Sequence, residues 1–355
     1  MSTNEEQLIR WDIGTAYDFF ASLVVLHNPE RYGLRGSWAA GVRSRLPAAE
    51  RETLQSCWEV LWPMRWVYTL PAPKDAATAL AVLEQATAAT RLRALMAALP
   101  PAADATLYAV AARRAWDEPE LRHLTGLMQE SDWRLQPPAA VRKLATHALD
   151  LWSDPAGSAD ALLSALSCYH EVFFAEEEAR LRPQLDAALA YAQTLAARLP
   201  PPALLEELSQ GLRLATENRA RELVLAPSFW ATPFVVLTML DEETALFVYG
   251  ARPADMSLVP GELVPDALYQ ALKALADPTR LRILRYLSDE PLAPAQLARR
   301  LRLRSPTVIH HLDALRLARL VIVTLEPEGK RYAMRPDALA TLFDMLTSFV
   351  DGREE

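Results

Sequence analysis

Prolines and capping residues divide the last quarter of this chain into short helices and one hairpin, in an order that few folds share. The run "DPTRLRILRYLSD" begins with Asp277 and Pro278, a pair typical of the N-cap and first turn of a helix. The run "SPTVIHHLDALRLARL" begins in the same way with Ser305 as the predicted N-cap and Pro306 after it. A further short helix begins at Pro294.

A predicted hairpin follows these helices. In "LVIVTLEPEGKRYAM", residues 326–329 have Pro second and Gly fourth, which suits a type I turn between two strands. The strongly apolar run "PDALATLFDMLTSFV" then predicts a last helix, and "PDALYQALKALA" predicts a first one. Helix, helix, short helix, turn, helix, hairpin and helix is the order of a winged helix-turn-helix, which we assign to residues 265–355.

The second helix of such a turn presents its N-terminal residues to the major groove of DNA. Val308, Leu312 and Leu315 share one face of this helix and are expected to meet the core, so the opposite face is free for DNA. The predicted DNA-contacting residues are Arg304, Ser305, Pro306, Thr307, Ile309, His310, His311, Lys330 and Arg331.

The adjacent histidines admit three interpretations: a face for nucleic acid, plain structural residues, or metal ligands. We favour His310 at the DNA surface and His311 half-buried. Charge supports a polyanion partner, because residues 267–336 carry a net charge of +7 although the chain as a whole carries −8.

The runs "LADPTRLRILRYL", "LARRLRLRSPTVIHHLDAL" and "EGKRYAM" resemble the ArsR-type family of bacterial winged-helix repressors over residues 265–350. The resemblance implies a homodimer formed through the first and last helices of the module, bound to double-stranded DNA at a near-palindromic operator. Where metal-sensing members carry a Cys pair, this chain reads "PLAPAQL", and its last helix has no His. No metal is therefore expected. Arg302 and Arg319 replace glycines that are frequent in the family, and Arg319 is expected to adopt a left-handed conformation.

The rest of the chain predicts a mainly α fold: a helical domain over residues 1–252, with two or three antiparallel strands near 223–250, and a linker at 253–264. Its layout is similar to the domain that precedes the winged helix in some longer ArsR-type regulators. That likeness implies a regulatory or dimer-supporting role and names no ligand.

Trp58, Trp62 and Trp66 recur at helical spacing and either line an apolar ligand pocket or simply pack between helices. The segment 168–183 holds Cys168, His170 and Glu171, but their spacing fits no standard metal site. With 11 Gly among 355 residues and no glycine-rich phosphate loop, the sequence predicts no cofactor.

The leading hypothesis is a cytoplasmic, homodimeric transcriptional repressor controlled by a non-metal small-molecule effector in the N-terminal domain. It is not expected to be an enzyme or to contact a membrane. One alternative is a constitutive regulator whose N-terminal domain only dimerises or recruits a protein. Another is an enzyme with a DNA-binding tail, which would need titratable side chains converging in a pocket.

Overall fold

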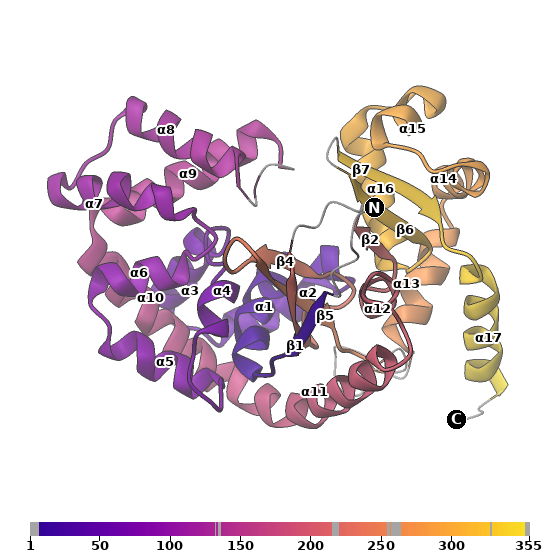
Figure 1. The fold of residues 1–355 in the computed structure, drawn as a ribbon, viewed down its shortest axis with the longest axis horizontal. Helices are drawn as coiled ribbons and strands as arrows, with labels where there is room; N and C mark the ends of the chain where they lie inside the picture. The colour runs from indigo at the N-terminus through magenta and orange to yellow at the C-terminus, as the bar shows by residue number, and fades with distance from the viewer. Residues whose placement is uncertain are drawn as a thin grey trace.

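The computed structural model describes residues 7–131, 133, 136–214, 220–253, 256, 264–326 and 329–351. A large helical body lies to one side and the C-terminal module to the other, with the long helix α11 running beneath the body toward the module (Figure 1). The mainly α class is confirmed. Within the described ranges, no helix combines the length and apolar character that crossing a membrane requires.

The helical body is built from short helices separated mostly by prolines and small polar residues, as the sequence predicts. Its elements are α1 (Thr15–His27), η1 (Pro29–Tyr32), α2 (Gly36–Ser44), α3 (Ala48–Cys57), α4 (Met64–Tyr68), α5 (Ala76–Gln85), α6 (Ala88–Leu95), η2 (Pro101–Ala103), α7 (Asp104–Arg113), α8 (Glu118–Gln129), α9 (Pro138–Ser153), α10 (Pro155–Tyr169), the π-helical turn η3 (His170–Phe174), α11 (Ala175–Ala196) and α12 (Pro201–Leu208).

A four-stranded sheet lies against this body, in the order β1 (Leu8–Trp11), β3 (Glu222–Ser228), β5 (Thr244–Gly250) and β4 (Val236–Met239). The expectation of antiparallel strands is wrong for most of this sheet. Strand β3 pairs in parallel with both β1 and β5, and only β4 runs antiparallel to its neighbour β5. Strand β4 comes between β3 and β5 in the sequence, but in the sheet it lies at the edge, on the far side of β5. Strands β3 and β5 are therefore direct neighbours, and they run in parallel.

Both faces of the sheet are buried, and they belong to two different cores. On β5, Leu246 and Val248 face the core of the helical body, whereas Phe247 and Tyr249 face a second core. This second core continues through α12 into the centre of the C-terminal module. Buried parallel strands read as continuous apolar runs, which explains the lack of polar alternation in "LFVY".

The C-terminal module has the predicted order of elements: α13 (Asp266–Leu275), α14 (Pro278–Asp289), α15 (Pro294–Leu301), α16 (Ser305–Leu317), β6 (Val321–Glu326), β7 (Gly329–Met334) and α17 (Ala338–Asp351). Strands β6 and β7 form the antiparallel wing, with Glu326 opposite Gly329. The two central residues of the predicted turn, 327 and 328, lie outside the described residues.

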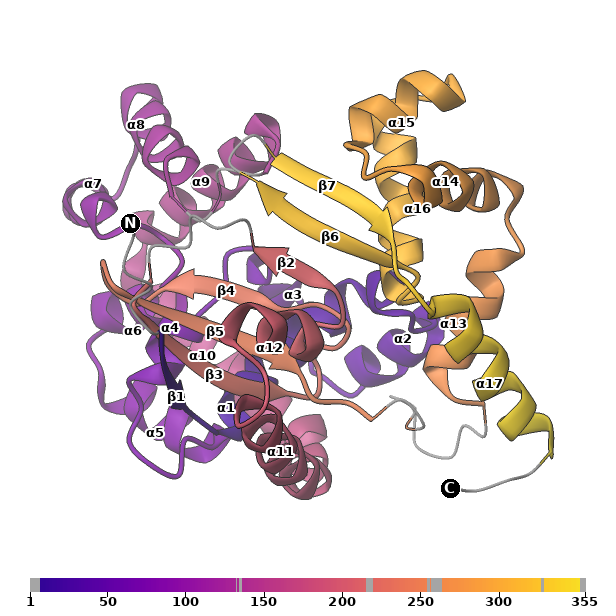
Figure 2. The ribbon, with the colours of Figure 1, turned by 45° about the vertical axis from the view of Figure 1, so that its right-hand side comes forward.

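A strand from the N-terminal part completes the sheet of the wing. Strand β2 (Leu212–Leu214) pairs in parallel with β6, so that Leu212 lies opposite Val323 (Figure 2). Gly211 has a φ of 109°, and a Cβ atom there would lie 3.3 Å from the Ile322 side chain. Strand β2, which precedes the expected division at residues 252 and 265, therefore belongs to the sheet of the module. Most of the expected linker, 254–255 and 257–263, lies outside the described residues.

Candidate nucleic-acid interface

Helix α16 is held in the module by an apolar face and leaves the opposite face free. Val308, Leu312 and Leu315 are fully buried in the second core, as the sequence predicts. On the other face, Ile309 remains 43% exposed, and His310 is also exposed. An exposed branched aliphatic side chain beside a polar one suits contact with a thymine methyl and a neighbouring base edge.

The start of α16 differs by one residue from the prediction. Arg304 occupies the N-cap position in extended backbone, without a side-chain cap hydrogen bond, and Ser305 is the first helical residue. Pro306 then falls in the first turn, where its missing N–H costs nothing. Ser305, Pro306 and Thr307 are all exposed, so the first turn of α16 offers its backbone N–H groups and short polar side chains to a phosphate.

The turn between α15 and α16 is closed by Arg302 in the left-handed region, at φ 56° and ψ 42°. A residue with a Cβ pays about 1–2 kcal/mol for this conformation. Arg299, Arg302 and Arg304 are exposed around this turn and add positive charge next to the helix that is expected to read DNA. Arg299 was missed by the sequence reasoning, although the Arg-Arg pair at the end of α15 was the available signal.

His311 points in a different direction from His310. Its side chain is 14% exposed, and Nδ1 lies 4.0 Å from Oδ1 of Asp277. Burial lowers the pKa of His311, although the Asp277 carboxylate acts in the opposite direction. Asp277 itself caps α14 by accepting a hydrogen bond from the Arg280 backbone N–H at 2.9 Å. His311 therefore connects the middle of α16 to the start of α14.

The two basic residues of the wing also diverge. Arg331 is exposed, with Nε 3.0 Å from Oε2 of Glu326 and Nη1 donating to the Pro291 carbonyl at 3.5 Å. Lys330 is exposed, yet it lines a cavity between the wing and the helical body. Successive residues of a strand point to opposite faces, so the side chains of Lys330 and Arg331 lie on opposite faces of the wing.

The cavity that Lys330 lines has a volume of about 430 Å³ and joins the helical body to the module. Trp58 and Trp62 form part of its wall on the body side, and Asp313 and Arg316 of α16 form part of the opposite wall. Trp66 does not line the cavity; its ring packs edge-on against Phe20, at 6.1 Å between centroids. The tryptophan triplet is thus divided between a cavity and the body core.

Arg316 anchors α16 to the segment that leads into β2. It is 8% exposed, and its Nη2 donates to the Ser209 carbonyl at 3.5 Å. Burial lowers the pKa of this guanidinium. The contact links the helix expected to read DNA directly to the N-terminal part of the chain.

No three His, Cys, Asp or Glu side chains gather as metal ligands within the part of the chain that the structure describes. Cys57 is buried and Cys168 half-buried, and burial raises the pKa of both thiols. His170 begins the π-helical turn η3, with Nε2 3.9 Å from Oε2 of Glu178.

The helix-turn-helix of α15 and α16, joined to the β6–β7 wing, defines a winged-helix protein of the DNA-binding class. The profile of the bacterial regulatory protein arsR family matches residues 277–323, from α14 to the start of β6. The chain belongs to this family, and it is a DNA-binding transcriptional regulator.

Two curated groups of relatives align with this region. The HTH-type transcriptional regulators CmtR of Mycobacterium bovis and Mycobacterium tuberculosis are 42% identical over 89 residues, which is 25% of this chain and 75% of each relative. The HTH-type transcriptional regulator Rv2034 of Mycobacterium tuberculosis is 42% identical over 87 residues, covering 24% of this chain and 77% of that protein. No solved structure matches the chain significantly.

Proposed function

We propose that this protein is a homodimeric repressor whose α16 reads an operator and whose DNA affinity is set by a non-metal effector held against the N-terminal part. The observation that carries the proposal is the cavity shared by the helical body, α16 and the wing. A ligand there contacts the sensing part and the reading elements at once.

The DNA-reading surface in this proposal is made of the exposed first turns of α16, the exposed turn before them and the outer side of the wing. Its residues are Arg304, Ser305, Pro306, Thr307, Ile309 and His310, with Arg331 on the wing. His311 and Lys330 act indirectly, the first by holding α16 against the start of α14 and the second by contacting the cavity.

The dimer surface in this proposal lies on α17 and α13. Phe343 and Val350 of α17 are 57% and 72% exposed, and Tyr269 and Leu272 of α13 are 43% and 39% exposed. Phe343 and Val350 are seven residues apart, which places them on one face of the helix, as in a helix-pairing seam. Figure 1 shows α17 at the outer edge of the module, away from the helical body.

The sensor is favoured over a constitutive regulator because the junction between the two parts is not fully packed. The cavity volume of about 430 Å³ falls in the range of small-molecule sites. The enzyme alternative has less support, because the titratable side chains around the cavity match no motif for nucleophilic or acid–base chemistry. They are Arg31, Tyr32, Glu59, Asp313, Arg316, Lys330 and Tyr332.

The test is binding of the purified full-length chain to DNA from its own upstream region, measured by fluorescence anisotropy across a salt series. We expect tight, sequence-dependent binding whose affinity falls steeply with salt. Unrelated DNA of equal length is the control. Equal affinity for both DNAs at every salt concentration would refute sequence-specific regulation by the free protein.

A further inference from the structure

A second cavity, of about 540 Å³, lies on the other side of the junction between the N-terminal part and the module. Helices α11 and α12 and the end of β5 form one wall, and α13, α17 and residues 318–320 form the other. The site lies beyond the carboxyl end of β5, the place where ligands bind in open sheets with parallel strands.

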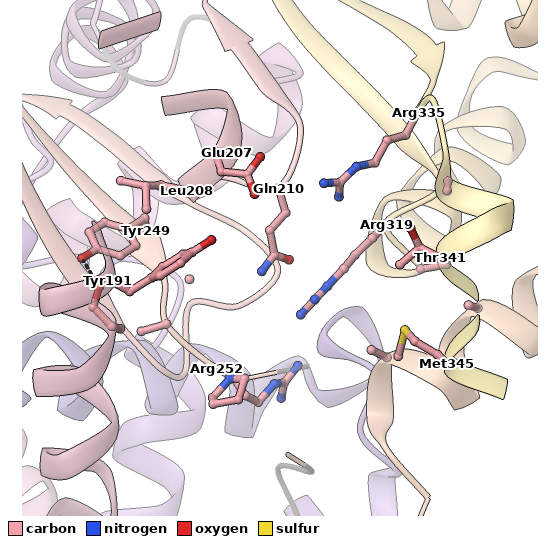
Figure 3. Close-up of a pocket in the computed structure, with 18 of the residues that line it drawn as sticks. Tyr191, Glu207, Leu208, Gln210, Tyr249, Arg252, Arg319, Arg335, Thr341 and Met345 are labelled. Carbon is pink, nitrogen blue, oxygen red and sulfur yellow. Dashed lines mark hydrogen bonds between the residues drawn. The ribbon is translucent and has the colours of Figure 1, made fainter. Parts of the chain in front are cut away.

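Three arginines from three separate segments point into this cavity (Figure 3). Arg252 follows β5, Arg319 lies between α16 and β6, and Arg335 follows β7. Burial lowers the pKa of Arg252 and of Arg319 to about 10, and for Arg319 the neighbouring Arg252 and Arg335 add to the effect. The guanidinium group of Arg319 therefore lies close enough to Arg252 and Arg335 to be repelled by both.

Among the described residues that line the cavity, these three arginines face one acid, Glu207. Arg252 is only 7% exposed, and its Nη1 forms an ion pair with Oδ2 of Asp266 at 3.6 Å, a distance too long for a hydrogen bond. Arg319 and Arg335 form no ion pair with any residue that the structure describes. The acid that lines the cavity, Glu207, is exposed on α12. A bound anion would supply the negative partner that the described residues do not give to Arg319 and Arg335.

One polar side chain and the apolar walls indicate which kind of molecule fits this cavity. The amide of Gln210 points into the cavity, and its buried Oε1 has no hydrogen-bond partner (Figure 3). Gln210 itself is held at a φ of 56°. Leu208, Tyr249 and Met345 are among the residues that give the walls an apolar character. Such a site suits an anionic head on an apolar body, with a hydrogen-bond donor facing Gln210.

We propose that this cavity binds an organic anion, a carboxylate or phosphate on an apolar body, whose head contacts Arg252, Arg319 and Arg335. In this proposal the anion is a second regulatory ligand, in addition to the effector of the tryptophan-lined cavity, and this role rests on the proposed function. The site is separate from the tryptophan-lined cavity on the other side of the junction.

The position of Arg319 explains how anion binding in this cavity changes the affinity for DNA. Arg319 has a φ of 57° and is the left-handed residue between α16 and the first strand of the wing. Arg319 precedes β6 and Arg335 follows β7, so both lie at the open end of the hairpin, where Val321 pairs with Met334. Drawing the two arginines toward one anion moves this end of the wing relative to α16. A coupling of the usual size changes DNA affinity by about 5- to 150-fold.

The experiment uses the full-length chain and two readouts, the melting temperature and anisotropy of upstream DNA. The probes are octanoate and phenyl phosphate, with 1-octanol and phenol as neutral counterparts and inorganic phosphate as an anion without an apolar body. We expect at least one organic anion, and neither neutral compound, to raise the melting temperature and change DNA affinity by about 5-fold or more. The probe that acts distinguishes a carboxylate from a phosphate ligand.

Single substitutions test whether the anion binds in this cavity. The response is expected to be lost in Arg319→Ala and weakened at least 10-fold in Arg335→Gln, which lies near the surface and serves if Arg319→Ala does not fold. Arg122→Ala, on the exposed side of α8, should respond as the wild type does. Equal responses in Arg335→Gln and the wild type, or no response to either organic anion, would overturn the proposal.

The two readouts separate this inference from the proposed function. If an organic anion raises the melting temperature through Arg335 but no specific DNA binding is found, the anion site stands and the regulatory proposal fails. If specific DNA binding is found and no anion binds, the regulatory proposal stands and the anion site fails.

Discussion

Asp18 offers a quantitative test of the junction between α1 and the sheet. This carboxyl is fully buried, and its Oδ1 accepts hydrogen bonds from Ser228 Oγ at 2.7 Å and from the Trp230 backbone N–H at 2.8 Å. Its Oδ2 has no partner. Burial raises the pKa of Asp18 from 3.8 to about 7, against the lowering effect of these hydrogen bonds.

The sign of the pH dependence follows from this shift. Because the folded state holds the proton more tightly than the unfolded state, ionisation of Asp18 removes stability as the pH rises from 3.8 to about 7, and the loss is complete above that. The whole shift corresponds to ~4 kcal/mol, of which about 2–3 kcal/mol develops between pH 5 and pH 8. Asn at this position cannot ionise, and its Oδ1 can accept both hydrogen bonds.

We therefore expect Asp18→Asn to gain about 2–3 kcal/mol of unfolding free energy relative to the wild type between pH 5 and pH 8. Urea unfolding followed by tryptophan fluorescence at both pH values measures this difference, and effects of other titrating groups cancel. Asp186→Asn, at an exposed position of α11, is the matched control. A difference between variant and wild type that stays constant with pH would refute the assignment of a proton to buried Asp18.

The remaining predictions concern the module. Ile309→Ala and His310→Ala should each weaken operator binding by roughly 10-fold in anisotropy while leaving binding to unrelated DNA unchanged, since each removes a base-edge contact worth about 1–3 kcal/mol; equal losses on both DNAs would argue against base reading. Phe343→Glu should convert a dimer into a monomer in sedimentation, whereas Tyr108→Glu, another exposed aromatic position, should not; a dimeric Phe343→Glu protein would exclude the α17 surface. Arg319→Met should raise the unfolding free energy without ligand by about 1–3 kcal/mol, because it removes a buried guanidinium whose pKa is lowered to about 10; a less stable variant would contradict this.

The module was predictable because its local signals agree. Asp277 and the prolines fix the helix starts, and the spacing of Val308, Leu312 and Leu315 fixes the buried face of α16. Arg319 was expected to be left-handed because family members have glycine there, and its φ is 57°. The one-residue error at Ser305 is the ordinary uncertainty of a helix end.

The larger sheet and the two cavities were not predictable in the same way. Strand β1 comes from the first residues of the chain and pairs with β3 more than 200 residues later, and nothing in a local pattern indicates so distant a partner. The run "ELVLAPS" carries no sign of direction, because a strand buried on both faces shows no alternation. The cluster of Arg252, Arg319 and Arg335 is invisible in sequence, since each arginine follows a different element.

The pairing of β2 with β6 decides how the two parts of the protein act on each other. If the module were a separate domain on a flexible linker, a ligand in the N-terminal part could change the local concentration of the module near DNA but not the shape of the module. Instead, Leu212 and Val323 are partners in one sheet, Arg316 donates to Ser209, and a single core runs from Phe247 to the centre of the module. Packed cores have discrete arrangements rather than continuous ones. A ligand that shifts α12 and β2 therefore has to shift β6, and with it the angle between the wing and α16.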